Sequence, residues 1–121
     1  MPVLLIAIEA PASAGLLEGL LEGMVLAALD DDVPLPPLYE AGINYQKEPL
    51  GRERWQLPRE TYRLRSGDCE DLCIYRVTEL RRAGEDAWCL VRQTGPKLWH
   101  VLVAREDGSV ECPSRALGMG K

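Results

Sequence analysis

Residues suited to covalent chemistry gather in the second half of the chain. Cys69 opens a predicted helix, His100 lies in the middle of a predicted strand, and Glu111 and Cys112 end the strand that follows. In the first turn of a helix, unpaired backbone N–H groups and the positive end of the dipole favour a thiolate and can hold a developing oxyanion. An imidazole can take the proton of such a thiol. These residue types predict a nucleophile at Cys69 and a base at His100.

Negative charge around the predicted nucleophile opposes this chemistry. Asp68, Glu70 and Asp71 surround Cys69, and they raise the pKa of its thiol unless they are paired or point away. A protonated His100 would favour the thiolate. The alternative role for His100, the single histidine of the chain, is a core residue with one hydrogen bond.

A helix and a small sheet must hold these side chains. Asp68 predicts an N-cap, close to a capping box with Asp71, for a helix that runs to Arg82 and stops at Gly84. The three strands predicted after it cover 87–92, 98–105 and 109–112. This order predicts an α+β fold in which the Cys69 helix packs on an antiparallel sheet.

The register of the last hairpin decides which side chain meets the imidazole. A two-residue turn places Glu111 on the face of His100, whereas a three-residue turn with a glycine bulge places Cys112 there. A thiol is a poor acceptor for an imidazole N–H, so we expect Glu111 to orient His100. The alternative for Glu111 is a solvated strand charge.

The N-terminal third of the chain predicts a strand and a helix. Val3 to Ile8 indicates a short buried strand, and Ser13 is a suitable N-cap for a helix that runs to about Leu29. Glycines fall at every fourth position of this helix, which indicates close helix packing: Gly15, Gly19 and Gly23. The stretch from Leu38 to Ser66 is irregular and predicts a packed loop.

Composition excludes several classes of partner. The chain has 121 residues, of which 46% are hydrophobic, and a formal net charge of −5. This length predicts one domain, and the negative charge argues against binding to nucleic acid or to an anionic membrane. The apolar run at the start lacks basic residues and is short, so we expect neither a secretion signal nor a membrane span.

The cysteines are expected to be reduced and free of metal. No two of them form a CxxC pair, and there is no second histidine to complete a usual zinc set. A Cys3His site of Cys69, Cys73, His100 and Cys112 is the metal-binding alternative. Cys89 is expected to be a small core residue.

Motifs across residues 38–119 resemble the transglutaminase-like superfamily, and above all its short phage-borne branch. The segment 66–73 is similar to the nucleophile segment, in which a Gly-Asp-Cys-Glu-Asp-Leu string opens the catalytic helix. The segment 99–103 resembles the histidine strand, and 110–114 resembles the next strand, which usually ends in Asp-Pro. At the position of that aspartate this chain has Cys112.

The resemblance implies a papain-like core and an amide-bond hydrolase or acyltransferase that works through an acyl-thioester. It implies catalytic residues Cys69 and His100, with Glu111 in place of the missing aspartate, and no metal or organic cofactor. Trp55 and Gln56 precede Cys69 at a distance where related folds place oxyanion or substrate-tunnel groups, although a packing role for Trp55 is the alternative.

The same resemblance implies a protein or peptide-like amide substrate. Its extent divides the single domain, 1–121, into an N-terminal extension (1–37) and a transglutaminase-like core (38–121). A phage origin would place the protein in the cytoplasm of an infected bacterial cell or in the virion, with phage structural proteins as partners. The missing aspartate supports a second hypothesis, a catalytically degenerate module with a structural or assembly role.

Overall fold

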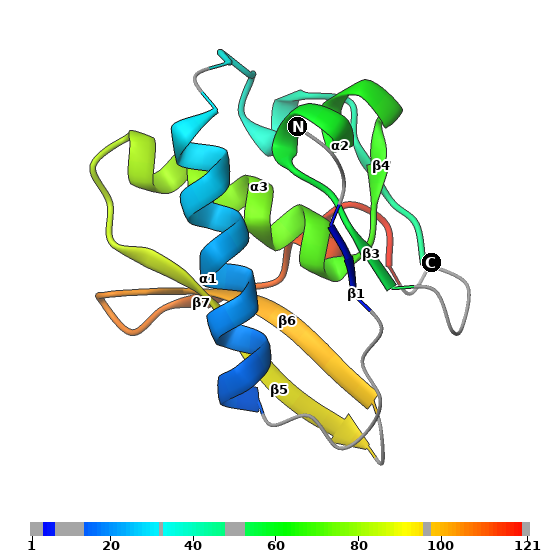
Figure 1. Cartoon of the computed structure of the whole chain (residues 1–121), viewed down its shortest axis with the longest axis vertical. Helices are drawn as coiled ribbons and strands as arrows, with labels where there is room; N and C mark the ends of the chain where they lie inside the picture. The colour runs from blue at the N-terminus through cyan, green and yellow to red at the C-terminus, as the bar shows by residue number, and fades with distance from the viewer. Residues whose placement is uncertain (1–3, 7–13, 32, 48–52, 96–97, 120–121) are drawn as a thin grey trace.

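The computed structural model describes residues 4–6, 14–31, 33–47, 53–95 and 98–119, which form an α+β fold (Figure 1). In chain order its elements are β1 (Leu4–Ile6), α1 (Ala14–Asp30), the 3-10 helix η1 (Leu38–Glu40), β2 (Asn44–Tyr45), β3 (Glu53–Trp55), α2 (Pro58–Leu64), β4 (Ser66–Gly67), α3 (Cys69–Arg82), β5 (Ala87–Gly95), β6 (Leu98–Arg105), β7 (Val110–Glu111) and α4 (Pro113–Ala116). The predicted α+β class and the predicted order of α3 and three following strands are confirmed.

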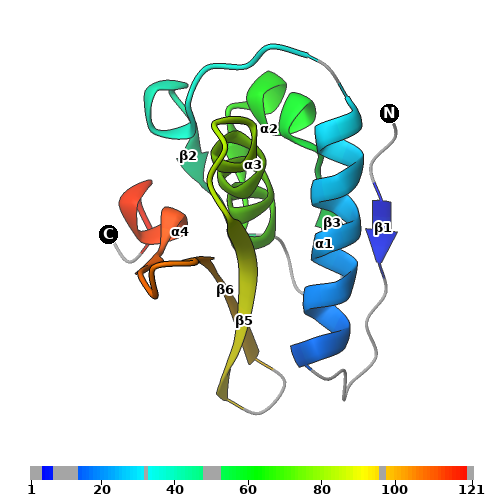
Figure 2. The same ribbon diagram turned by 90° about the vertical axis from the view of Figure 1, so that its left-hand side faces the viewer.

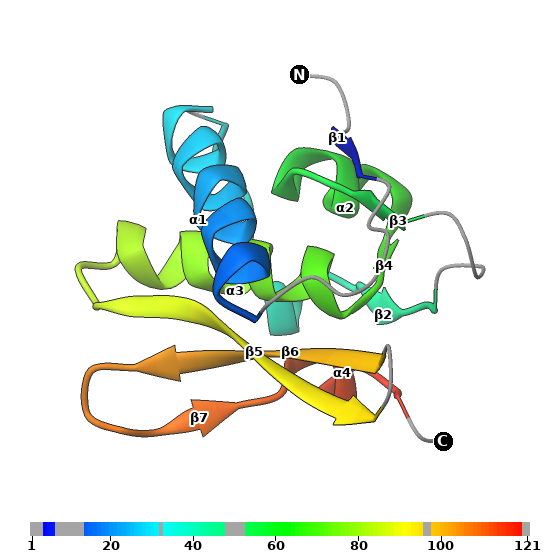
Figure 3. The ribbon, with the colours of Figure 1, turned by 60° about the horizontal axis from the view of Figure 1, so that its bottom comes forward.

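The largest sheet is an antiparallel meander in the order β5-β6-β7 (Figure 3). Strands β5 and β6 pair along nearly their whole length, whereas β7 reaches β6 only at Val103 and Ala104. Two smaller pairs, the antiparallel β1-β3 and the parallel β2-β4, lie outside this sheet. Within the described residues, the part of β6 that carries His100 therefore has no strand neighbour on the β7 side.

Helices α1 and α3 share one core with the β5–β6 hairpin. Side chains alternate along both strands, and the alternate residues that face the helices are buried, as a half-covered sheet requires. The core consists of Leu17, Leu21, Met24, Val25, Ala28, Trp55, Leu57, Cys69, Cys73, Ile74, Val77, Leu80, Ala87, Cys89, Val91, Val101 and Val103. Helix α1, predicted as part of an extension, is thus a constituent of the core, and α4 lies on the opposite side of the hairpin (Figure 2).

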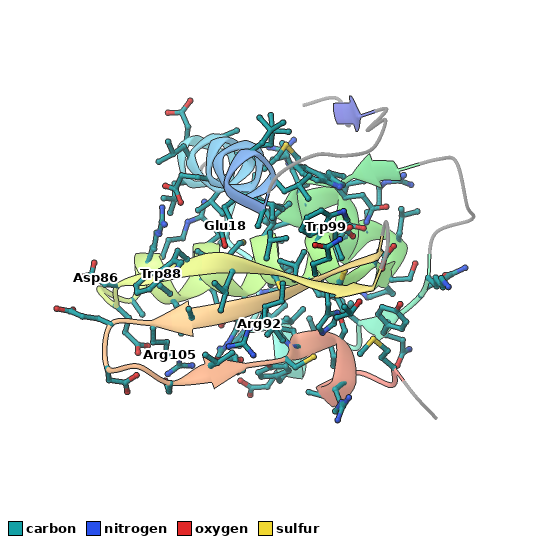
Figure 4. The ribbon with its side chains drawn as sticks, turned by 90° about the horizontal axis from the view of Figure 1, so that it is seen from below. Glu18, Asp86, Trp88, Arg92, Trp99 and Arg105 are labelled. Carbon is teal, nitrogen blue, oxygen red and sulfur yellow. The ribbon has the colours of Figure 1, made fainter. Side chains whose placement is uncertain are left out.

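Two glutamates fix α1 against the elements beneath it. Glu18 accepts the Val91 N–H at 2.8 Å on the open edge of β5, so a side chain covers a backbone group that would otherwise attract another strand. Figure 4 shows Glu18 between α1 and the hairpin. Glu22 forms two hydrogen bonds with Arg81 of α3, at 2.6 and 2.7 Å. These contacts set the position of α1 relative to α3.

The glycines of α1 do not mediate close packing. A Cβ atom added at Gly15, Gly19 or Gly23 would meet no atom within 4 Å among the neighbours described. The prediction of close helix packing at these positions is therefore wrong, because the four-residue spacing identifies one side of the helix without saying whether anything covers it. Leu16 and Leu26 are also exposed on α1.

The stretch predicted as an irregular loop contains a helix and several short strands. Pro58 is the first residue of α2, where its fixed φ suits a helix start and its missing N–H costs nothing. Arg65, with φ of 57°, ends α2 in the left-handed region. A second core on the far side of α3 is formed by Leu38, Ala41, Ile43, Leu72 and Tyr75. Among the described residues, no helix has both the length and the apolar character to cross a bilayer.

Candidate active site

The start of α3 is fixed by a capping box. The Asp68 carboxylate accepts the Cys69 N–H at 2.7 Å and also the N–H of Asp71, while the Asp71 carboxylate accepts the Asp68 N–H at 3.0 Å. The predicted cap is confirmed. It also has a chemical consequence, because the Cys69 N–H that could hold an oxyanion already has a partner.

Asp71 ties the preceding loop to α3. Its side chain is fully buried and accepts the Gln56 N–H at 2.7 Å. Gly67 must be a glycine, because a Cβ there would lie 2.8 Å from the Cβ of Asp71. Three residues of the family-like string, Gly67, Asp68 and Asp71, therefore have structural roles that are independent of chemistry at Cys69.

Cys69 is the first residue of α3, with only 7% of its surface exposed. Burial raises the pKa of its thiol, the negative charges of Glu70 and Asp68 raise it further, and a hydrogen bond from the Val101 backbone opposes them. The net pKa lies well above the ordinary value. In the resting protein the sulfur is thus a protonated thiol beside strand β6.

A second thiol contacts the same backbone position. Cys73, one turn along α3, is fully buried and donates its S–H to the Val101 carbonyl at 3.3 Å. Beyond the last pair between β6 and β7, the two cysteines of α3 take hydrogen bonds of β6 that a longer β7 would have satisfied. Both thiols therefore help to hold α3 against β6.

His100 faces away from the main core, since its neighbour Val101 faces into it. Its Nε2 lies 3.2 Å from the Cys112 sulfur, at the end of β7. Burial lowers the pKa of His100, the positive charge of Arg115 lowers it further, and Asp68 acts in the opposite direction. The imidazole is accordingly neutral at neutral pH, and Cys112 is its polar side-chain partner.

Glu111 does not orient the imidazole, contrary to expectation. It pairs with Val103, which places it on the core face of the sheet. There its carboxylate accepts hydrogen bonds from Tyr39, from Arg76 at 3.0 Å and from Arg105 at 2.5 Å. Burial alone would raise the pKa of Glu111, but these hydrogen bonds lower it below the ordinary value. The hairpin therefore has the register that the three-residue turn predicts, with Cys112 towards His100.

Tyr45 is a site residue that sequence reasoning missed. The parallel pairing of β2 with β4 places Tyr45 opposite Gly67, and its hydroxyl hydrogen-bonds to Asp68. Burial, together with the charges of Asp68 and Glu70 and the hydrogen bond to Asp68, raises the pKa of Tyr45 to about 12. A two-residue strand leaves no periodic signal in the sequence, so only the paired structure reveals this neighbour.

The other sequence candidates near the site have structural surroundings. Gln56 donates its side-chain amide to Thr61 at 3.1 Å and to the Ser66 carbonyl at 3.2 Å, which occupies the group that an oxyanion would need. Trp55 is buried in the main core, and its Nε1 has no hydrogen-bond partner among the described residues. Its surroundings match the packing role.

Side chains that could bind a metal ion come together at the start of α3. In the part of the chain that the structure describes, the one set of three whose ligand atoms all lie within 4.8 Å of one another is Asp68, Cys69 and Glu70. Cys73, His100 and Cys112 do not join such a set with Cys69, so the alternative Cys3His arrangement is not assembled. Two described pockets, of about 350 and 290 Å³, lie elsewhere, beside the turns at residues 84–86 and 35–37.

Comparison of this sequence and fold with protein-family models, curated proteins and solved structures finds no match.

Proposed function

We propose that the protein is a thiol-dependent amide-bond hydrolase or acyltransferase of the transglutaminase-like type, with Cys69 as nucleophile and His100 as base. Cys112 takes the third position in place of the expected carboxylate. The substrate would be a protein or peptide-like amide.

The observation that carries this proposal is the contact of His100 Nε2 with the Cys112 sulfur at 3.2 Å. This contact joins two of the three motif positions, one on β6 and one at the end of β7, although they are twelve positions apart in the chain. Cys69 lies beside the same strand through its hydrogen bond with the Val101 backbone. The tautomer whose Nε2 donates its proton to Cys112 leaves Nδ1 unprotonated, as a base for Cys69 requires, whereas the other tautomer leaves Nε2 unprotonated towards Cys112.

The pKa shifts determine the form of the mechanism. Since the Cys69 thiol and the imidazole are both neutral at rest, the proton leaves the sulfur as the sulfur attacks the carbonyl, and His100 receives it. The imidazolium then protonates the departing amine as the C–N bond breaks. Water or a second amine cleaves the thioester. A preformed thiolate–imidazolium pair plays no part in this scheme.

An activated acyl ester tests the proposal directly. Treatment of the full chain with p-nitrophenyl acetate is expected to place an acetyl thioester on Cys69, found by mass spectrometry in the tryptic peptide 66–76. Cys69→Ser should abolish it and Cys73→Ser should retain it. His100→Gln should slow acylation by about 100-fold or more, the usual contribution of a general base. Acylation that is independent of His100, or absent from Cys69, would refute the proposal that Cys69 and His100 act as nucleophile and base.

Specific observations favour a second candidate, a catalytically degenerate module with a structural or assembly role. The Cys69 N–H is occupied by Asp68, the sulfur is buried, and a thiol stands where a carboxylate would stabilise an imidazolium. In that case Cys69 and Cys73 act only as packing residues that bind the Val101 backbone. The ester experiment separates the two candidates.

A further inference from the structure

Cys112 differs from the other three thiols in its surroundings. Cys69, Cys73 and Cys89 are buried in the main core, whereas Cys112 is partly exposed. Burial makes the first three thiols less accessible to an electrophile than Cys112, which lies at the junction of β7 and α4. All four are free thiols.

Cys112 is also the thiol with a base against it. The 3.2 Å contact joins its sulfur to Nε2 of His100, and the hairpin register together with Pro113, the first residue of α4, fixes where the sulfur lies. Charges acting on the imidazole come from Arg115 and Asp68. A thiol in hydrogen-bond contact with an imidazole can lose its proton as it attacks.

We propose that Cys112 and His100 form a thiol–disulfide exchange site that reacts with small disulfides. In the tautomer that carries its proton on Nδ1, Nε2 of His100 accepts the Cys112 proton as the Cys112 sulfur forms a bond with one sulfur of the disulfide. The original S–S bond breaks, and the departing thiolate takes the proton from the imidazolium. The product is a mixed disulfide on Cys112, which a reducing thiol reverses.

This modification would control the adjacent site. A group attached to the Cys112 sulfur removes the partner of His100 Nε2 and adds bulk beside the ring. Acyl transfer through Cys69 would stop until reduction restores the contact. Only this consequence rests on the proposed function, since the exchange reaction needs Cys112 and His100 alone.

Peptide mapping tests the inference, because trypsin separates the thiols. Cys112 falls in peptide 106–115, Cys69 and Cys73 in 66–76, and Cys89 in 83–92. With a neutral dipyridyl disulfide in small excess, labelling of 106–115 is expected to be at least about tenfold faster than labelling of the other two. Equal labelling rates of the three peptides of the parent protein, or faster labelling of 66–76, would by themselves overturn the inference.

Variants then test the role of the base. His100→Gln should slow labelling of Cys112 by about tenfold or more. The matched control is Arg92→Gln, because Arg92 is exposed and lies opposite His100 in the pairing of β5 with β6. Figure 4 shows Arg92 on the hairpin. This substitution should leave the rate unchanged. An unchanged rate in His100→Gln contradicts the inference, whereas fast, His100-dependent labelling in Cys69→Ser supports it even if Cys69 proves unable to form an acyl-thioester.

Discussion

Replacing Glu111 with Gln is expected to destabilise the fold while leaving the thiol chemistry unchanged. The Glu111 side chain is 22% exposed, and its carboxylate lies between the guanidinium groups of Arg76 and Arg105. Exposed ion pairs contribute about 0–1 kcal/mol, and removal of one partner from a buried pair costs about 3–5 kcal/mol. With this intermediate exposure and two cationic partners, we expect a loss of about 2 kcal/mol.

The loss should depend on pH in a defined direction. The pKa of Glu111 in the folded protein lies below its ordinary value of 4.5, so the carboxylate adds stability above that value and loses it as the pH falls through the folded pKa. Urea unfolding should therefore separate the parent from Glu111→Gln at neutral pH and show a smaller difference in acid.

Glu85→Gln is the matched control, because Glu85 also pairs with Arg105, at 3.4 Å, but is 48% exposed. It should cost about 0.5 kcal/mol or less. Equal effects of the two substitutions would refute the assignment of Glu111 as a structural ion-pair residue. A Glu111→Gln protein that has the stability of the parent but no longer acylates Cys69 would also refute this assignment.

Three further predictions concern α3, α1 and the Cys69 thiol. Gly67→Ala should lower the free energy of unfolding by about 1–3 kcal/mol, because its Cβ would lie 2.8 Å from the Cβ of Asp71, whereas Gly19→Ala, with open space around it, should raise it by about 0.5–1 kcal/mol. The melting temperatures of the two variants should therefore shift in opposite directions, and shifts of the same sign would contradict the packing. Asp71→Asn should cost about 3 kcal/mol, since the buried carboxylate accepts two N–H groups at 2.7 and 3.0 Å, and urea unfolding that matches the parent would contradict this. The rate of Cys69 alkylation by iodoacetamide should keep rising with pH beyond about pH 9, where the rates of ordinary thiols level off, because burial, Glu70 and Asp68 raise the pKa of its thiol. A plateau near neutral pH would contradict a protonated Cys69 in the resting protein.

Local signals in the sequence predicted helix α3 well. Its N-cap Asp68, its capping box with Asp71 and its end at Arg82 all follow from residues within a few positions of one another. The bounds of β6 also match the prediction. Pro58 misled the interpretation of the loop before α3, because proline both breaks helices and begins them.

Partners distant in the sequence could not be predicted. Glu111 was expected to face His100, yet its hydrogen-bond partners Tyr39 and Arg76 come from η1 and α3, and a one-residue change of register decides its face. Tyr45 reaches Asp68 through a strand pair of two residues. The residue types of the site were evident in the sequence, but the choice between Glu111 and Cys112 required the paired strands.

The rate of Cys69 acylation in Cys112→Asp tests the central claim most directly. If His100 serves Cys69 as a base, a carboxylate at position 112 should hold the imidazole tautomer and stabilise the imidazolium, and a thiol does both poorly. Acylation by p-nitrophenyl acetate, followed in peptide 66–76, should then rise by about tenfold or more over the parent, and His100→Gln in the same background should remove the gain. A folded Cys112→Asp protein that acylates Cys69 no faster than the parent would contradict a functioning unit of Cys69, His100 and position 112.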